Sequence, residues 1–346
     1  MLLSPEEIKQ QTRNLWRDTF HDDEDFLSLY FDEKYSDRDN FTLRPNGYVA
    51  AAMQMLPYRV SIYGQSVHAG YVSGLCVMPD FRRHGLASRL LFDSHRRLYQ
   101  QGGVLSFLIP SDDSLRAFYE KPQHGAFWTT TYRKETPLPQ PEGETPNRLS
   151  IVEAEAWTAD LYVYFRRHTA REFMVHPSET DFFVALDDCS LAGGHILVAY
   201  KGRRICGICL AVRETDGRAF VRSLVADDGN VRDAFVRRLQ QDEKVEQVFA
   251  RVPAPGSAPE VKPYAMARVV NVERFLSAVM RAYPDLEMSI GVDGDLFIPE
   301  NNGYYRLAGG RVSITDERPE TIVTPGGLAA LFLSSYPMYV EMMLDE

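Results

Sequence analysis

The pattern of apolar and polar positions divides residues 1–133 into helices, strands and turns in a regular order. Apolar residues recur at helical spacing near the start, where Ile8, Leu15 and Trp16 share one face. Strand-like runs follow, and turn signals such as Tyr63-Gly64 separate them. The predicted elements are helices at 5–19, 22–34, 86–101 and 111–120, and strands at 47–58, 59–62, 68–77 and 104–109.

Two proline-rich segments interrupt this pattern and predict domain boundaries. Residues 134–150 and residues 252–263 each contain four prolines and show no apolar periodicity. Proline at this density favours extended linkers that cannot join a central strand or helix. The segments therefore predict three domains, at 1–135, 148–252 and 262–346.

The second domain repeats the order of the first in outline, which predicts a duplication. Both copies read as an α/β (α+β) fold with a mixed central sheet flanked by helices, and the third domain reads as a small α+β unit. The elements predicted in the second domain are strands at 194–200, 205–213 and 219–225 and a helix at 231–241. Those predicted in the third are strands at 265–270, 288–292, 295–298, 303–307 and 311–315 and helices at 272–283 and 324–344.

The charge balance narrows the classes of partner. The 346 residues carry 38 Lys and Arg against 48 Asp and Glu, a formal net charge of −10. A nucleic-acid-binding protein normally needs a basic face, so this balance argues against a large nucleic-acid footprint and leaves open a cationic substrate drawn to an acidic cleft. The sequence shows neither a membrane-spanning stretch nor a signal peptide. We therefore expect a cytoplasmic protein with no nucleic-acid and no membrane partner.

The cysteines and histidines predict no metal site. Cys206 and Cys209 have a redox spacing, but they fall within a predicted strand, and a second such pair for zinc is missing. Four cysteines are also too few for a disulfide framework at this length. We expect them to be buried and inert. The histidines without metal-ligand spacing are His68, His124, His176 and His195.

Residues 75–91 carry the strongest chemical signal. They predict a strand, a turn holding Arg82, Arg83 and Gly85, and then a helix. Gly85 permits a positive φ or a close backbone approach, and the small Ala87 keeps that approach open. The first amides of a helix attract anions, and the arginines add positive charge. These features favour a pyrophosphate cradle over an ordinary turn with solvated arginines.

The same residues resemble a known family. Val77-Met-Pro-Asp-Phe-Arg-Arg-His-Gly-Leu-Ala-Ser-Arg-Leu-Leu is similar to the acetyl-CoA signature of the Gcn5-related N-acetyltransferases (GNAT superfamily), and Ser114-Leu-Arg-Ala-Phe-Tyr-Glu-Lys resembles the closing helix of that fold. The order of the three domains resembles the enhanced intracellular survival family, with its tandem GNAT folds and a third domain similar to sterol carrier proteins. This resemblance implies acetyl-CoA as co-substrate and a homo-oligomer.

The resemblance also implies roles for individual residues. Direct attack of an amine on a thioester needs oxyanion donors and an acid for the leaving thiolate. Tyr119 matches the tyrosine of the family pattern and is the implied acid, with a core aromatic as the alternative. The implied base is the C-terminal carboxylate, here that of Glu346, with a frayed terminus as the alternative. The implied acetyl-CoA-binding residues are Leu75, Cys76, Val77, Arg82, Arg83, His84, Gly85, Leu86, Ala87 and Ser88.

Two acidic clusters qualify this hypothesis. The run Asp22-Asp-Glu-Asp25 either lines an acidic substrate entrance or starts a solvated helix. In the second domain, the position that matches the cradle holds Asp227 and Asp228, which would repel a pyrophosphate. That domain is therefore expected to act as a scaffold.

The predicted function is that of an acetyl-CoA-dependent N-acetyltransferase acting on the primary amine of a cationic small molecule or a lysine. The alternative is a non-catalytic protein that senses CoA or binds an apolar ligand through the sterol-carrier-like domain. The cradle at residues 82–87 favours the enzyme.

Overall fold

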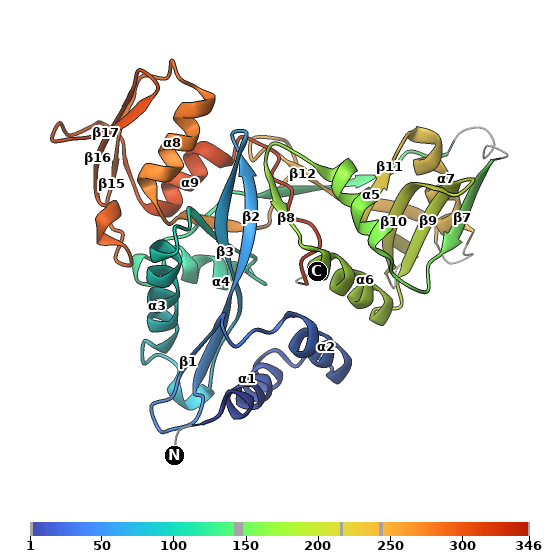
Figure 1. Cartoon of the computed structure of the whole chain (residues 1–346), viewed down its shortest axis with the longest axis horizontal. Coiled ribbons are helices and arrows are strands. Elements are labelled where there is room, and N and C mark those ends of the chain that lie inside the picture. Colours follow the sequence, from blue (N-terminus) through green and yellow to red (C-terminus); the bar gives the residue numbers. More distant parts are fainter. Residues whose placement is uncertain (1–2, 142–147, 215–216, 242–244, 345–346) are drawn as a thin grey trace.

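The first sheet is organised around a long hairpin formed by β2 (Ala51–Ile62) and β3 (Gln65–Val77). The computed structural model describes residues 3–141, 148–214, 217–241 and 245–344. Sequence predicted two strands before the turn at Tyr63, whereas β2 runs without a break. The sheet order is β1-β2-β3-β4-β14-β5, and β8 pairs with β2 (Figure 1). The other strands are β1 (Asn40–Leu43), β4 (Leu105–Leu108), β5 (Trp128–Thr129), β8 (Met174–His176) and β14 (Met266–Val269).

Helices cover both faces of this sheet because neighbouring residues of β2 point in opposite directions. Met53 packs with Leu90 and Leu91 on one face, while Ala52 packs with Leu15 on the other. The helix expected at 22–34 is present as an α-helix that continues into a π-helical turn. The helices are α1 (Pro5–Phe20), α2 (Glu24–Leu29), the π turn η1 (Tyr30–Lys34), α3 (Leu86–Gln100) and α4 (Asp113–Tyr119).

The second sheet, in the order β13-β6-β12-β11-β10-β9-β7, repeats this design. Its apolar clusters again lie on two faces, one under α5 and α6 and one under α7. Cys206 and Cys209 are buried in β10 as free thiols, as expected. The strands are β6 (Tyr132–Pro137), β7 (Leu149–Glu153), β9 (His195–Lys201), β10 (Arg204–Arg213), β11 (Arg218–Ala226), β12 (Gln247–Ala254) and β13 (Lys262–Pro263). The helices are α5 (Ala159–Thr169), α6 (Glu179–Leu191) and α7 (Gly229–Gln240).

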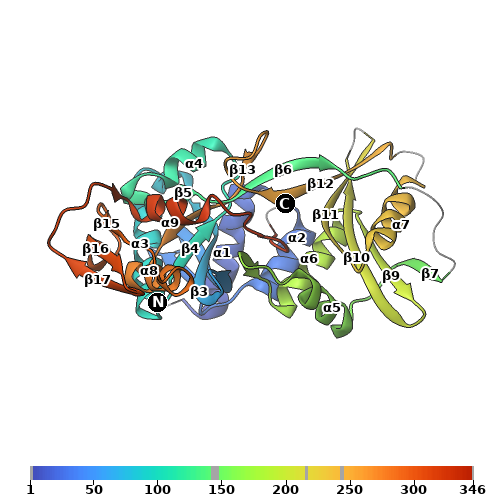
Figure 2. The ribbon, with the colours of Figure 1, turned by 90° about the horizontal axis from the view of Figure 1, so that it is seen from above.

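The proline-rich segments take part in this sheet, which corrects the expectation that they could not join a strand. Pro137 ends β6 and pairs with Phe249, and Pro253 lies within β12 opposite Arg133. Both prolines stand near strand ends, where fewer ladder hydrogen bonds are lost. Figure 2 shows β6 and β12 running side by side from the first sheet to the second.

A third, smaller sheet with the order β17-β16-β15-β18 packs beside α8 and α9. One apolar cluster runs from the tip of the β2–β3 hairpin through α8 into β15 and β16. No helix in the described part of the chain is long and apolar enough to cross a membrane. The elements are α8 (Val272–Ala282), β15 (Met288–Val292), β16 (Gly303–Ala308), β17 (Arg311–Thr315), β18 (Ile322–Val323) and α9 (Pro325–Leu333).

The helix expected at 324–344 forms only over its first half, as α9, and the strand expected at 295–298 is wrong. The last helix ends at Leu333, because Pro337 follows and cannot donate the hydrogen bonds of a continuing helix. The chain then runs extended, and Tyr339 bridges to Met174 of β8. Residues 295–298 form a loop whose amides bond to the side chain of Asp295 rather than to a neighbouring strand.

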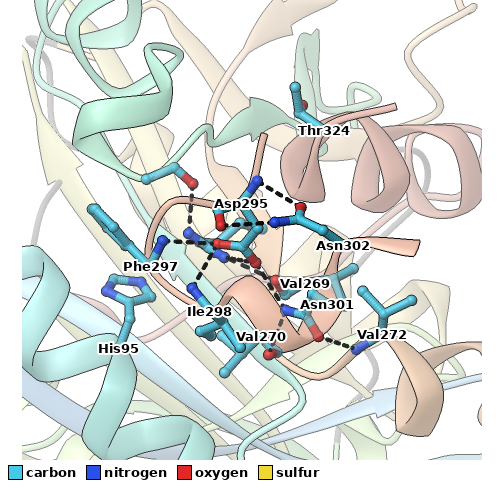
Figure 3. Close-up of polar contacts among 12 residues, drawn as sticks. His95, Val269, Val270, Val272, Asp295, Phe297, Ile298, Asn301, Asn302 and Thr324 are labelled. Atoms are coloured by element: carbon cyan, nitrogen blue, oxygen red, sulfur yellow. Dashed lines mark hydrogen bonds and ion pairs between the residues drawn. The ribbon is translucent and has the colours of Figure 1, made fainter. Parts of the chain in front are cut away.

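A buried ion pair joins this loop to the first sheet. Arg268 of β14 donates to the Asp295 carboxylate at 2.6 Å, and their side chains are 1% and 0% exposed. Arg268 also donates to the Gly125 carbonyl at 2.8 Å. The other Asp295 oxygen accepts from the Phe297 and Ile298 amides (Figure 3). Every charge in the cluster is thus met by a partner, which a buried pair needs to offset its desolvation.

Asn301 and His95 extend the same cluster. Asn301 donates to Asp295 at 2.8 Å and to the Val270 carbonyl at 3.0 Å. His95, buried in α3 beside Phe297, donates from Nδ1 to the Leu91 carbonyl, with 2.6 Å between the two atoms. Burial and the nearby Arg268 charge lower the pKa of His95 to about 3, so the ring is neutral at pH 7.

Arg268→Met should cost about 3–5 kcal/mol of unfolding free energy, because it leaves the Asp295 charge buried without a partner. Arg96→Met is the matched control: it removes a more exposed pair, Arg96–Glu300, and should cost less than about 1 kcal/mol. Urea unfolding at pH 7 measures both. Equal losses for the two variants would contradict this account of the buried pair.

Candidate active site

A cleft opens where two parallel strands separate. β3 pairs with β4 only from Ala69 to Tyr71, although β3 continues to Val77. Gly74 bends the strand with a φ of 60°, and a side chain there would meet the Trp16 ring at 1.8 Å. The backbone of residues 72–77 therefore has β2 on one side and an opening on the other. A cavity of about 1670 Å³ occupies this opening.

The predicted cradle forms one end of this cleft. The chain leaves β3 through a short 3-10 turn, and Arg82 donates from Nε to the Val77 carbonyl at 3.1 Å. Arg83 and Gly85 then adopt positive φ values of 66° and 79° before α3 begins. No side chain caps α3 and no acidic residue stands in its first turn. Its first amides thus face the opening unopposed, which favours an anion.

The structure brings almost all of the predicted acetyl-CoA-binding residues to this cleft. His84 is the exception, because its side chain is exposed and lies outside the lining. The residues that do line the cleft are Leu75, Cys76, Val77, Arg82, Arg83, Gly85, Leu86, Ala87 and Ser88.

Tyr119 lies at the end of α4 and lines the same cleft. Its ring packs against Phe118 and Phe127, and its side chain makes no hydrogen bond to any described residue. Burial raises the pKa of Tyr119, so the hydroxyl keeps its proton at neutral pH. His124, which spacing did not single out, stacks on Phe118 and also lines the cleft. Burial lowers the pKa of His124.

The opposite wall of the cleft is acidic. Asp22 accepts from the Trp16 indole at 2.7 Å, and Asp23 caps α2 through the Phe26 amide. Asp188 of α6 adds a third carboxylate from the second sheet, and burial raises its pKa despite an ion pair with Arg222 at 2.6 Å. All three aspartates line the cleft.

The rest of the acidic run lies differently. Glu24 turns toward Arg13 and Arg17, both at 2.9 Å. The sequence pointed to the run at residues 22–25, and of that run Asp22 and Asp23 line the cleft.

The C-terminal segment reaches this cleft from the second sheet. Arg133 donates to the Val340 carbonyl at 2.5 Å, and Ser223 donates to the Glu341 carboxylate at 3.0 Å. Three residues later, Leu344 lines the cleft. Glu346, the implied base, lies outside the described residues.

The second sheet has a corresponding opening that offers different chemistry. β11 and β12 are parallel from Arg218 to Val221 and then separate. Tyr339 and Glu341 of the C-terminal segment line this opening. At the start of α7, Asp228 caps the helix and pairs with Lys201 at 2.8 Å. A carboxylate thus takes the place that free amides hold at α3, which disfavours a phosphate.

Comparison with known proteins agrees with this geometry. Residues 3–123 match a family model described as an acetyltransferase (GNAT) domain. The match covers both the cradle and Tyr119, and it supports an acetyltransferase enzyme. No curated protein matches the chain.

Solved structures extend the likeness of the fold over nearly the whole chain. A probable N-acyltransferase from Enterococcus faecalis is 14% identical with a TM-score of 0.74. The match covers 97% of this chain and 89% of the E. faecalis chain. Eis1 from Mycobacterium abscessus is 15% identical with a TM-score of 0.72, covering 96% and 88%. A GCN5-related N-acetyltransferase from Anabaena variabilis is 16% identical with a TM-score of 0.71, covering 96% and 89%. The predicted fold class is confirmed.

The predicted phosphate-binding turn can be tested by placing a negative charge at Gly85. Gly85→Glu places a carboxylate before the first amides of α3, where the structure leaves open space, and should weaken acetyl-CoA binding at least about tenfold. Gly309→Glu is the control, because it imposes the same backbone strain in a distant open turn. Calorimetric titration with acetyl-CoA should separate the two variants. Unchanged binding by Gly85→Glu would place the phosphates elsewhere.

Proposed function

We propose that this protein is an acetyl-CoA-dependent N-acetyltransferase that acts on the primary amine of a cationic small molecule or a lysine. One observation carries the proposal: the uncapped start of α3, the open backbone of β3 and an acidic wall share a single cleft. GNAT acetyltransferases use acetyl-CoA as the acyl donor, and nothing in the lining opposes that choice.

Different residues of the cleft have different roles in the proposed reaction. Arg82, Arg83 and the first amides of α3 hold the pyrophosphate, and the free edge of residues 72–77 offers hydrogen bonds to the rest of the donor. Asp22, Asp23 and Asp188 attract a cationic substrate to the other wall. A neutral amine then attacks the thioester carbon and the C–S bond breaks. The attacking nitrogen loses a proton to the base, for which we propose the Glu346 carboxylate, and the Tyr119 hydroxyl gives its proton to the thiolate.

The simplest test measures CoA release. The protein is incubated with acetyl-CoA, a thiol-reactive dye and amines of graded charge, including polyamines, a lysine peptide and a neutral primary amine. We expect amine-dependent thiol release, fastest with the polycations, and an amide product by mass spectrometry. Binding of acetyl-CoA without transfer to any amine would favour the CoA-sensing alternative.

Tyr119→Phe should lower kcat by about 10²–10⁴ and leave the KM for acetyl-CoA nearly unchanged, because a general acid acts in the transition state. Tyr99→Phe removes a hydroxyl from α3 outside the cleft lining and serves as control. Steady-state kinetics at saturating amine decides the point. A kcat unaffected by Tyr119→Phe would assign the residue to packing.

The C-terminal segment can be tested by extension. If the carboxylate of Glu346 is the base, a short Gly-Ser extension after it should lower kcat by about 10²-fold, because Leu344 already lines the cleft. Acetyl-CoA affinity and melting temperature should stay the same, since the cradle lies at α3. The same extension placed before Met1 is the control. Full activity of the C-terminally extended protein would move the base to the acidic wall.

A further inference from the structure

A second large cleft lies at the opposite end of the β2–β3 hairpin and takes no part in the proposed reaction. Its volume is about 1390 Å³. The hairpin forms its floor, α8 stands on one side and α5 on the other, as Figure 1 shows for these elements. Three distant parts of the sequence therefore meet in this cleft.

A row of basic side chains crosses the floor. Arg59 of β2 pairs in register with His68 of β3 on one side and with His176 of β8 on the other. Residues opposite each other on adjacent strands share a face of the sheet, and all three line the cleft. Adjacent strands lie about 4.8 Å apart, so the row spans about 10 Å.

Arginines extend this row at both ends. Arg166 of α5 lies near enough to His176 for its charge to lower the histidine pKa, and Arg274 and Arg281 line the cleft from α8. Arg166 lies against the Tyr162 ring, and Arg274 donates to the Gly102 carbonyl at 3.0 Å. None of these arginines, nor Arg59, forms an ion pair with a carboxylate in the described part of the chain.

The negative charge available inside the cleft is small. Of its two lining carboxylates, Asp181 is bound by Lys34 and by the Tyr58 hydroxyl, which leaves Glu273. Four guanidinium groups therefore face one free carboxylate, in a protein whose net charge is −10. Like charges that line one cleft repel one another, so an anionic ligand would stabilise the arrangement.

Burial and the nearby arginine charges lower the pKa values of both histidines. Burial and the Arg59 charge lower the pKa of His68, and burial and the Arg166 charge lower the pKa of His176. A bound anion would oppose both arginine charges and raise these pKa values again.

We propose that this cleft is a binding site for an extended phosphate chain, of the kind carried by nucleoside triphosphates and inorganic polyphosphates. The linear row fits a ligand whose charges are spaced along its length, and arginine is the side chain best suited to phosphate oxygens. The cleft is concave and larger than a typical small-molecule pocket, which suits a ligand of nucleotide size. Because β8 and α5 follow the first domain in sequence, bound ligand would hold the first and second sheets together.

Binding of inorganic tripolyphosphate and of ATP, measured by calorimetry with CoA saturating the first cleft, tests the proposal. Wild-type protein should bind tripolyphosphate, and the double substitution Arg59→Gln with Arg166→Gln should weaken binding at least about tenfold. The double substitution Arg306→Gln with Arg311→Gln, which removes the same number of charges at exposed positions of the third sheet, should leave binding unchanged. Binding of both probes would identify the phosphate chain as the determinant, and binding of ATP alone would identify a nucleotide.

An independent readout comes from the histidines themselves. Imidazole NMR signals of His68 and His176, assigned with His→Gln variants, should titrate at higher pH when tripolyphosphate is present. The proposal is overturned if neither probe binds, if Arg82→Gln abolishes the binding instead, or if the two histidine pKa values do not move. Binding of a single-stranded oligonucleotide but of neither probe would also overturn it.

Discussion

The buried ion pair between Arg268 and Asp295 sets the position of much of this molecule. Two charges without water are stable only when every donor and acceptor is met, so the pair allows little freedom to the segments that carry it. Arg268 sits on β14, the strand that neighbours β4. The pair thereby ties the loop that carries Asp295, between β15 and β16, to the strand beside β4.

The two α/β units show how one fold can be open to a ligand in one copy and closed to it in the other. Both contain a pair of parallel strands that separate and a helix that begins beside the opening. In the first unit the helix begins at Gly85, which leaves its amides free. In the second, Asp228 caps the helix and the C-terminal segment crosses the opening. The two units therefore share a topology. They differ in the charge at the start of the helix and in whether the C-terminal segment crosses the opening.

The junction between the two units separates charge. Lys34 and Asp181 form a buried pair across it, supported by the Tyr58 hydroxyl. On one side of this pair lies the acidic wall with Asp22, Asp23 and Asp188, and the basic row around Arg59 lines the other cleft. A cationic substrate and an anionic ligand would thus be drawn to different clefts of the same molecule. Occupation of either would stabilise the junction, because each cleft takes residues from both units.

The sequence by itself determined the turn at Gly85, the repeated order of elements and most helices, because their signals are local. A glycine before an uncapped helix, arginines beside it and apolar residues at helical spacing act within a few positions of one another. The same locality explains the errors: the apolar spacing after residue 333 resembled a helix, although Met338, Val340 and Met343 pack into the apolar cluster of the first and third sheets and Met342 into one of the second. Only the tertiary structure placed Met266–Val269 beside β4 and paired Arg59 with His176 across neighbouring strands. It also brought Asp188 to the cleft that Asp22 lines. Those partners lie more than 100 residues apart, and burial and charge compensation across the folded chain bring them together.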